Sequence, residues 1–293
     1  MSVRPDLAAL RQRLDRAPVT RFAPSPTGYL HLGHVVNAIY VWGVARALGG
    51  AVRLRIEDHD RIRSRPAYEA SLLEDLDWLG FEADEGRHPP CRQSGRLPAY
   101  AQALQRLSEA AHVFACDCSR REIGGERYPG TCRTRGLADG PQRGLRVALD
   151  PGEEDFVDAL LGPQRQSPAG DAGDLLLRDR DGHWTYQFAV TVDDARDGVN
   201  LVIRGLDLLS STGRQLRLAR MLDRADQPVF LHHPLLLDAG GHKLSKSSRH
   251  TGIRELRQGG ATAQAVLGHA AAAAGLIGAP RPLPASAVPR LFE

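Results

Sequence analysis

The segment from residue 19 to residue 80 restricts the fold more than any other part of the chain. The pattern of apolar, Gly and Pro residues predicts a strand at 19–23, a helix at 33–48, a second strand at 51–56 and a second helix at 66–80. Prolines and a glycine separate the first strand from the first helix, and paired glycines end that helix. This order of strand and helix predicts an α/β fold with a parallel sheet.

The alternation breaks down after the second helix. Residues 111–149 are rich in Cys, Arg and Gly and show little periodicity, which predicts an inserted subdomain. Asp181-Gly182 lies between apolar segments at 175–178 and 184–188, a pattern that predicts a β-hairpin. Later apolar stretches predict a strand at 199–203, a helix at 206–222 and a buried segment at 229–237.

Composition argues against a membrane-spanning protein and against a disulfide framework. The 293 residues are 42% hydrophobic and 25% charged, and no segment reaches the roughly 18 uncharged apolar residues that a membrane span needs. Residues 1–17 lack the apolar core of a signal peptide, so we expect a cytoplasmic protein. The net charge is only +3, but arginines cluster at 61–65 and 120–135. These clusters either neutralise nucleic-acid phosphates or form solvated faces.

Two histidines stand at the start of the first predicted helix, in the stretch Arg21-Phe22-Ala23-Pro24-Ser25-Pro26-Thr27-Gly28-Tyr29-Leu30-His31-Leu32-Gly33-His34. Their spacing puts both imidazoles on one side of the first turn, where the helix N-terminus offers backbone N–H groups and partial positive charge. Gly33 lets a nucleotide approach closely. A lone His-x-x-His usually marks a helix cap and a core contact, but this context predicts a site for phosphate oxygens.

The lysines carry a second signal. Of the 38 basic residues, 36 are Arg and two are Lys, and both lysines, Lys243 and Lys246, fall in Lys-Leu-Ser-Lys-Ser after Gly240-Gly241. An ammonium group is a compact, mobile point charge, whereas guanidinium is a rigid planar fork. A glycine-hinged loop with two ammonium groups can close over a triphosphate and stabilise the charge that develops at the α-phosphate. The alternative is a solvated basic loop.

Three of the four cysteines crowd together, at Cys116, Cys118 and Cys132. In a cytosolic chain such crowding favours a metal site over a disulfide. Zinc takes tetrahedral thiolate and nitrogen ligands, usually from Cys pairs two to four residues apart, so Cys-x-Cys is a tight spacing. Spacing alone leaves His112 and Tyr128 as alternative fourth ligands. Cys91 stands apart and is interpreted as a spare thiol.

In this order, the motifs resemble those of class I aminoacyl-tRNA synthetases. His31–His34 resembles the HIGH motif and Lys243–Ser247 resembles the KMSKS motif. The stretch from Arg21, together with Trp184–Ala189, Val192-Asp193-Asp194 and Val202–Gly205, resembles the glutamyl branch of the family. The resemblance implies a Rossmann-type doubly wound parallel sheet, an adenylate intermediate and Mg²⁺ bound with ATP. It also implies that His31, His34, Lys243 and Lys246 are catalytic, and that His31, Gly33, His34 and Lys246 bind ATP.

The same resemblance implies a glutamate pocket. Arg21, Phe22, Ala23, Pro24 and Ser25 match the family's amino-acid pocket, Glu57 matches the acid that receives the substrate ammonium, and Tyr186 and Arg204 match the remaining contacts to glutamate. Glutamate brings two carboxylates and one ammonium, so two arginines and one acid are complementary partners. An arginine facing the side-chain carboxylate would disfavour neutral glutamine. The alternative for these residues is a structural ion pair or a surface acid.

The inserted subdomain resembles that of the glutamyl-queuosine tRNA(Asp) synthetases, which carry a Cys-x-Cys…Tyr-x-x-x-Cys zinc site. The resemblance implies one structural zinc held by Cys116, Cys118, Tyr128 and Cys132. Only 46 residues follow Ser247 (293 − 247), and domains usually exceed about 50 residues, so we expect no anticodon-binding domain. The implied activity is tRNA-independent activation of L-glutamate with ATP, followed by transfer to the queuosine base of tRNA(Asp) by a monomer.

The implied division is a first catalytic half at 18–110, a zinc-bearing acceptor-binding insertion at 111–185, a second catalytic half at 186–240, and the KMSKS loop with a C-terminal stem-contact segment at 241–293. Three alternatives stay open. One is a shortened glutamyl-tRNA synthetase that charges the 3′ end of tRNA(Glu). The second is a nucleotidyltransferase with the same phosphate motifs, which would not need the glutamate pocket. The third is a non-catalytic, zinc-dependent RNA-binding protein.

Overall fold

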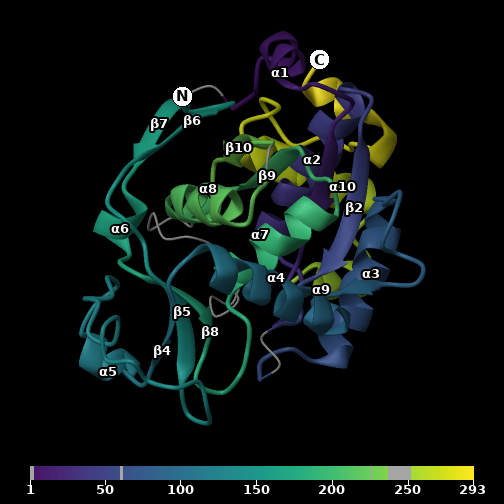
Figure 1. Cartoon of the computed structure of the whole chain (residues 1–293). Helices are drawn as coiled ribbons and strands as arrows, with labels where there is room; N and C mark the ends of the chain where they lie inside the picture. The colour runs from purple at the N-terminus through teal and green to yellow at the C-terminus, as the bar shows by residue number, and fades with distance from the viewer. Residues whose placement is uncertain (1–2, 60–61, 225, 237–251) are drawn as a thin grey trace.

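The computed structural model describes residues 3–59, 62–224, 226–236 and 252–293. Two parallel sheets lie side by side at the centre of the larger part of the molecule (Figure 1). Asn200 joins them, because its N–H donates to the Val19 carbonyl at 3.1 Å and its Oδ1 accepts from the Val19 N–H at 2.7 Å. In spatial order the strands are β3 (Cys91–Arg92), β2 (Ala51–Ile56), β1 (Val19–Phe22), β9 (Leu201–Gly205), β10 (Val229–His233), β6 (Glu154–Asp158) and the antiparallel edge strand β7 (Gly162–Gln166).

Helix α2 (Leu32–Ala47) is apolar on nearly all sides, because it lies between the sheets and the C-terminal helices. It packs against β1, β2 and β9 on one side and against α10 and the C-terminal turn on the other. A helix covered all round needs no polar face. The other main helices are α1 (Leu7–Arg13), α3 (Pro66–Leu79), α4 (Leu97–Ala110), α7 (Tyr186–Arg196), α8 (Thr212–Met221), α9 (Ile253–Gln258) and α10 (Ala263–Ala273). Among the described residues, no helix combines the length and apolar character needed to cross a bilayer.

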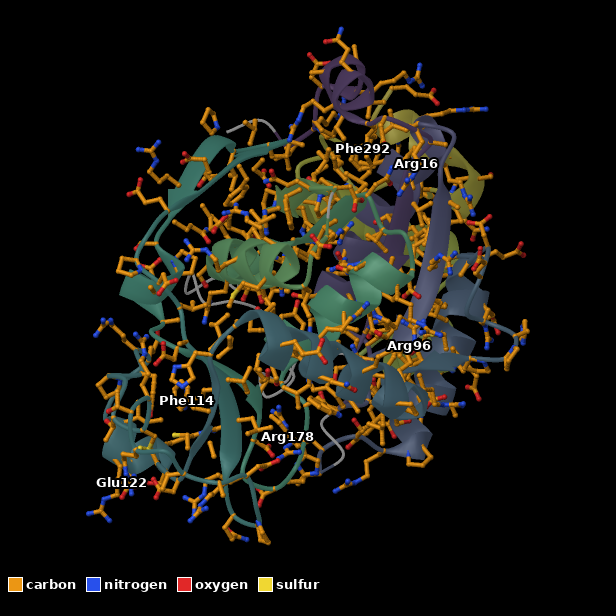
Figure 2. All side chains as sticks on the ribbon, viewed as in Figure 1. Arg16, Arg96, Phe114, Glu122, Arg178 and Phe292 are labelled. Atoms are coloured by element: carbon orange, nitrogen blue, oxygen red, sulfur yellow. The ribbon has the colours of Figure 1, made fainter. Side chains whose placement is uncertain are left out.

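A second lobe lies at the end of the molecule opposite α1 and the C-terminus (Figure 1). Its three antiparallel strands are β4 (Val113–Cys116), β5 (Gly144–Val147) and β8 (Leu175–Arg178), and the short helix α5 (Arg120–Ile123) lies beside them. Phe114, Glu122 and Arg178 lie in this lobe, whereas Arg96 lies in the larger part (Figure 2). The lobe has a small core of its own, formed by Phe114, Cys116, Tyr128 and Cys132.

The parallel sheet is confirmed, as are the strand at 51–56 and, within one or two residues, the first two helices. The predicted hairpin is wrong in its second arm. Asp179 to Gly182 form the turn after β8, but residues 184–188 make only one bridge before α7 begins at Tyr186. The segment from Tyr186 is helical because Phe188, Ala189 and Val192 recur at helical spacing and are buried against other helices.

The predicted helix at 206–222 is also two elements, a 3₁₀ turn (Leu206–Ser211) followed by α8. The predicted insertion at 111–185 contains β6, which pairs with β10 in the central sheet, and β7, which pairs with β6 at the edge of that sheet. Backbone hydrogen bonds thus connect the middle of that range to the larger part of the molecule. The division of the chain into domains stays a prediction.

Candidate active site

A cavity of about 660 Å³ opens where β1, β9 and β10 end. Parallel sheets bind ligands at the carboxyl ends of their strands, where the strand order reverses. The loop after β1, the first turn of α2 and the segments after β9 and β10 supply the walls of the cavity. Lining residues include Phe22, Ala23, Pro24, Ser25, His31, Gly33, His34, Asn37, Gly205, Asp207 and His233.

The two predicted histidines lie together in this cavity. His31 is the N-cap of α2, and its Nδ1 accepts a hydrogen bond from the Gly33 N–H at 3.1 Å. His34 Nδ1 accepts from the His31 N–H at 3.1 Å, and the ring centroids are 3.9 Å apart. Since Nδ1 is an acceptor in both rings, each neutral imidazole carries its proton on Nε2. Both side chains therefore suit the donation of an N–H to a phosphate oxygen.

The predicted lysine loop, with Lys243 and Lys246, lies outside the described residues. Its described flanks, however, both lie beside the histidine pair. Leu236 lines the cavity, and the Ile253 N–H donates to the Leu30 carbonyl at 2.9 Å, one residue before His31. Leu236 and Ile253, on either side of the predicted loop in the sequence, therefore both lie next to the start of α2.

A buried network of charges surrounds Glu57. Arg55 is 1% exposed, and its Nη2 donates to Glu57 Oε1 at 3.1 Å. Arg21 Nε donates to both Asp194 oxygens, at 3.1 and 3.2 Å, so the predicted Arg21 already has a carboxylate partner within the chain. Burial acts to raise the pKa of Asp194, but Arg21 and Arg55 hold it below its ordinary value. The network comprises Arg21, Arg55, Arg96, Glu57, Asp193, Asp194 and Asp197.

In this network three guanidinium groups face four carboxylates, so one negative charge is in surplus when all are ionised. Burial raises the pKa of Glu57, with Arg55 and Arg21 acting in the opposite direction. A desolvated acid of this kind gains from a cation that enters beside it. The loop after β1 holds Glu57 in place, because the Ser25 hydroxyl donates to its carbonyl at 2.8 Å and its N–H donates to the Pro24 carbonyl at 3.0 Å.

Arg204 differs from the other buried arginines of the site in its partners. It is 3% exposed, and its guanidinium donates to three neutral acceptors on other side chains. Within the part of the chain that the structure describes, Arg204 forms no ion pair with a carboxylate. Burial lowers the pKa of its guanidinium, and the nearby Tyr186 phenol acts in the opposite direction. Burial also raises the pKa of Tyr186, which interacts electrostatically with Arg204, Glu57 and Arg21.

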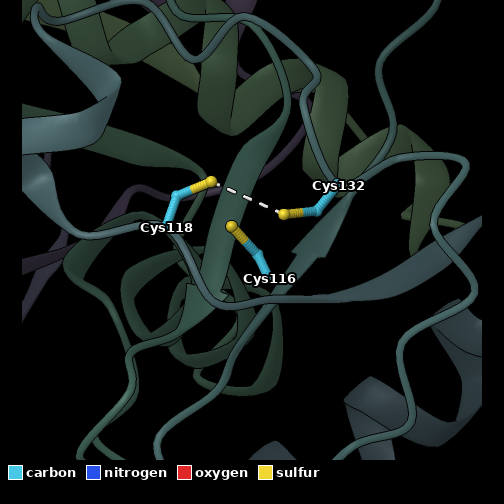
Figure 3. A group of neighbouring side chains, drawn as sticks. All are labelled: Cys116, Cys118 and Cys132. Carbon is cyan, nitrogen blue, oxygen red and sulfur yellow. Dashed lines mark hydrogen bonds between the residues drawn. The ribbon is translucent and has the colours of Figure 1, made fainter.

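The predicted metal ligands converge in the second lobe. The three thiol groups of Cys116, Cys118 and Cys132 point toward one another (Figure 3), and their sulfur atoms lie within 4.8 Å of one another. Cys118 Sγ is 3.5 Å from Cys132 Sγ, close to the separation of about 3.8 Å for two sulfurs on one tetrahedral zinc. The Tyr128 oxygen is 3.4 Å from Cys116 Sγ, but it also accepts from the Cys132 N–H at 2.8 Å.

Comparison with known proteins decides the family. The model of "tRNA synthetases class I (E and Q), catalytic domain" matches residues 18–270. The chain belongs to this family. It is 41% identical over 280 residues to the glutamyl-Q tRNA(Asp) synthetase of Nitratidesulfovibrio vulgaris, a match that covers 88% of this chain and 86% of the relative. It is 42% identical over 287 residues to the protein of the same name from Symbiobacterium thermophilum, covering 90% and 88%.

Solved structures of the class I synthetase family show the same fold. The glutamate-tRNA synthetase of Elizabethkingia anophelis matches with a TM-score of 0.70 at 28% identity, over 84% of this chain and 54% of that one. The chain therefore spans about half the length of this solved synthetase. A structure described as a putative arginyl-tRNA synthetase from Campylobacter jejuni matches with a TM-score of 0.51 at 12% identity and shows the fold alone.

The sequence did not single out several residues that surround the candidate site. Arg55, Arg96 and Asp197 hold the network around Glu57, and His232 contacts Arg204. Two charged segments of the sequence indicate this network, namely Arg55-Ile56-Glu57-Asp58 at the end of β2 and Asp193-Asp194 on α7. Charged residues in elements that pack into the core need partners of opposite charge. Which acid pairs with which base depends on how α7 packs against β2, and the sequence alone does not contain that information.

Proposed function

We propose that this chain activates L-glutamate with ATP, releases pyrophosphate, and transfers the glutamyl group to the queuosine base of tRNA(Asp). The names of its relatives, at 41% and 42% identity over most of both chains, support this proposal. Family membership supports glutamate, ATP and tRNA as the substrate classes, with Mg²⁺ bound together with ATP. We further propose that the protein acts as a monomer in the cytoplasm and activates glutamate without tRNA.

One observation carries the proposal, namely the buried Arg204 guanidinium without a carboxylate partner among the described residues. A desolvated positive charge is costly unless an anion completes it. Tyr186 links this charge electrostatically to Glu57, whose surroundings favour a cation. An amino acid with an ammonium group at one end and a second carboxylate at the other complements both charges, whereas neutral glutamine leaves Arg204 unpaired.

In the proposed reaction the glutamate α-carboxylate attacks the α-phosphate of ATP. Glu57 receives the ammonium group, and Arg204 and Tyr186 hold the side-chain carboxylate. Residues 22–25 line the adjoining cavity, and Ser25 of this stretch bonds to the Glu57 carbonyl. The Nε2–H groups of His31 and His34 donate to phosphate oxygens, and Gly33 leaves room for the nucleotide. Lys243 and Lys246 are assigned from the sequence alone to stabilising the charge that develops at the α-phosphate. Mg²⁺, when bound, neutralises part of the triphosphate charge.

We propose that Cys116, Cys118, Tyr128 and Cys132 hold one structural zinc ion. The donor set fits, because the three sulfurs lie within 4.8 Å of one another and the Tyr128 oxygen lies 3.4 Å from Cys116 Sγ. Burial and the neighbouring cysteines raise the pKa of the Cys118 thiol to about 12. Without a cation the Cys118 thiol therefore resists ionisation, and a bound divalent cation reverses this preference. Zinc would fix the loop that follows β4 against the rest of the lobe.

Pyrophosphate exchange tests the activation step. The protein is incubated with ATP, Mg²⁺ and labelled pyrophosphate, with glutamate, glutamine or aspartate and without any tRNA. We expect label to enter ATP with glutamate and at least about 100-fold less efficiently with glutamine, since the uncharged amide leaves a buried guanidinium unpaired. No glutamate-dependent exchange, with or without tRNA, would contradict the proposal and favour the RNA-binding alternative.

A further inference from the structure

Arg204 is connected to a buried carboxylate through a histidine rather than directly. Its Nε donates to His232 Nε2 at 3.0 Å, and His232 Nδ1 lies 2.7 Å from Asp158 Oδ2. Both the His232 and the Asp158 side chains are 0% exposed. His232 lies on β10 and Asp158 ends β6, whereas Arg204 lies on β9, so three adjacent parallel strands contribute one residue each.

Hydrogen-bond geometry fixes the state of the His232 imidazole. A carboxylate only accepts, so the proton lies on Nδ1, and the Arg204 Nε–H requires Nε2 to be an acceptor. His232 is therefore neutral, with its proton directed at Asp158. Burial lowers the pKa of His232, while the bond to Asp158 acts in the opposite direction. Protonation at Nε2 would set two donors against each other.

Asp158 is itself held in one orientation. Its Oδ1 accepts from the Leu160 and Leu161 N–H groups at 2.9 and 3.0 Å, and its Oδ2 accepts from the His232 N–H at 3.0 Å. A carboxylate with this many backbone donors cannot rotate without losing them. The orientation of Asp158 therefore determines the tautomer of His232, and that tautomer determines where Arg204 Nε points.

The remaining contacts of Arg204 complete the support. Nη1 donates to Gln215 Oε1 at 2.7 Å and Nη2 donates to Thr212 Oγ1 at 2.7 Å. With the Nε bond, three of the five guanidinium N–H groups are held by neutral acceptors, one on each nitrogen. A direct carboxylate partner would hold the group as firmly but cancel its charge, as Asp194 does for Arg21. A neutral imidazole fixes the group and leaves its charge for a ligand.

We propose that Asp158 and His232 are positioning residues that orient Arg204 for the glutamate side-chain carboxylate and thereby set the preference for glutamate over glutamine. This inference rests on the proposed function. Both side chains are 0% exposed. The His232 ring nitrogens contact Asp158 on one side and Arg204 and Thr212 on the other, so the two residues act on the ligand through Arg204. Their effect is expected on the binding of the amino acid and not on the binding of ATP.

The variant Asp158→Asn tests the hydrogen-bond chain from Asp158 through His232 to Arg204, and it leaves the volume of the side chain almost unchanged. The oxygen of the introduced amide would still accept from the two leucine N–H groups, and this orientation presents the amide NH₂ to the His232 ring in place of Oδ2. The bond that Oδ2 accepts from the His232 N–H is lost, which is why unfolding is measured beside binding. The imidazole then moves its proton to Nε2, where it opposes Arg204 Nε–H. We expect the KM for glutamate in pyrophosphate exchange to rise about 10- to 100-fold. This is the size of effect known for residues that orient a metal ligand through a hydrogen bond, and Asp158 and His232 orient Arg204 in the same way. The KM for ATP should change less than about twofold, and glutamine should be rejected less strongly.

Two further variants separate positioning from folding. His232→Gln places an amide oxygen where Nε2 accepts from Arg204, so it should retain more glutamate affinity than His232→Leu, which removes the acceptor. Asp155→Asn is the matched control, because Asp155 is an exposed acid of the same strand that pairs with Arg165. Thermal unfolding and calorimetric binding of glutamate are measured for all four variants.

The outcomes distinguish failure of the positioning role of Asp158 and His232 from failure of the proposed function. An unchanged glutamate KM in folded Asp158→Asn would overturn the positioning role and leave the proposed function intact. An equal loss of glutamate affinity in His232→Gln and His232→Leu would do the same. An equal rise in the KM for ATP and for glutamate would also overturn the positioning role, because that pattern indicates general distortion. Absence of glutamate-dependent exchange in the unmodified protein would instead overturn the proposed function.

Discussion

At the scale of single residues, the site separates two uses of arginine. Arg21 donates to Asp194, and Arg55 is surrounded by acids, so both hold the framework of the pocket together. Arg204 has neutral partners in the part of the chain that the structure describes. The sequence suggested Arg21 and Arg204 as equal partners of glutamate, because residue type and position give no information on internal pairing.

Replacement of Arg204 by Gln tests its assignment. The amide keeps a polar group of similar length but removes the charge that would pair with the substrate carboxylate. Charged hydrogen bonds of this kind contribute about 2–3 kcal/mol, so we expect the glutamate KM to rise about 30- to 150-fold. Steady-state pyrophosphate exchange measures it. Arg11→Ala, which removes an exposed arginine of α1, is the control, and an unchanged KM in Arg204→Gln would refute the assignment.

At the scale of elements, the contact between α3 and α9 contains a buried acid. Asp75 of α3 is 0% exposed, and among the described residues its ion pair is with Arg257 of α9, at 3.3 Å. Burial raises the pKa of this carboxyl to about 6. The folded protein therefore binds a proton that the unfolded chain has already released between about pH 4 and pH 6.

Stability should consequently fall as pH rises through this window, because the folded state holds more protons than the unfolded state. We expect Asp75→Asn to be more stable than the unmodified protein by about 1–3 kcal/mol at pH 8, with the difference close to zero at pH 4. Urea unfolding at both pH values measures this. Asp77→Asn, on the exposed side of α3, is the control. A stability difference that does not depend on pH would show that the buried charge has no such cost.

The second lobe offers a test of its proposed zinc. Cys132 is fully buried and contacts both Cys118 and the Tyr128 oxygen. Cys132→Ser should lose the metal and lower the melting temperature by about 5–10 °C, from a loss of about 2–3 kcal/mol. Metal analysis should find about one zinc per chain in the unmodified protein and in Cys91→Ser, whose thiol contacts Arg96 instead. Equal zinc content in Cys132→Ser would remove this residue from the ligand set.

The sequence predicted the elements with strong local signals and failed where packing decides. Pro66 and Gly80 bound α3 as expected, because proline suits the first turn and Gly80 adopts a left-handed φ of 81°. Residues 184–188 were predicted as the second arm of a hairpin because Asp181-Gly182 separates them from the apolar segment at 175–178. Their helical burial beside α4 and α8 is a long-range effect that no short window contains.

At the scale of the whole molecule, the site joins segments that are far apart in the chain. Two of its residues, His31 and Glu57, precede the second lobe in the chain, and two, Tyr186 and Arg204, follow it. The sequence motifs predicted all four as site residues. The motifs did not show that β6 enters the central sheet between β7 and β10. Asp158 therefore escaped notice, because a single acid in an irregular region has no signal until its strand neighbours are known.

Transfer to RNA tests the central claim most directly. The protein is incubated with ATP, Mg²⁺, labelled glutamate and one of three RNAs, namely tRNA(Asp) that carries queuosine, tRNA(Asp) that lacks it, or tRNA(Glu). Each RNA is used with its 3′ end intact and, separately, after periodate oxidation that blocks ordinary charging. The account predicts label on queuosine-containing tRNA(Asp) alone, unaffected by oxidation of the 3′ terminal ribose when the queuosine diol is protected. Label on the intact 3′ end of tRNA(Glu), and none on queuosine-containing tRNA(Asp), would contradict it.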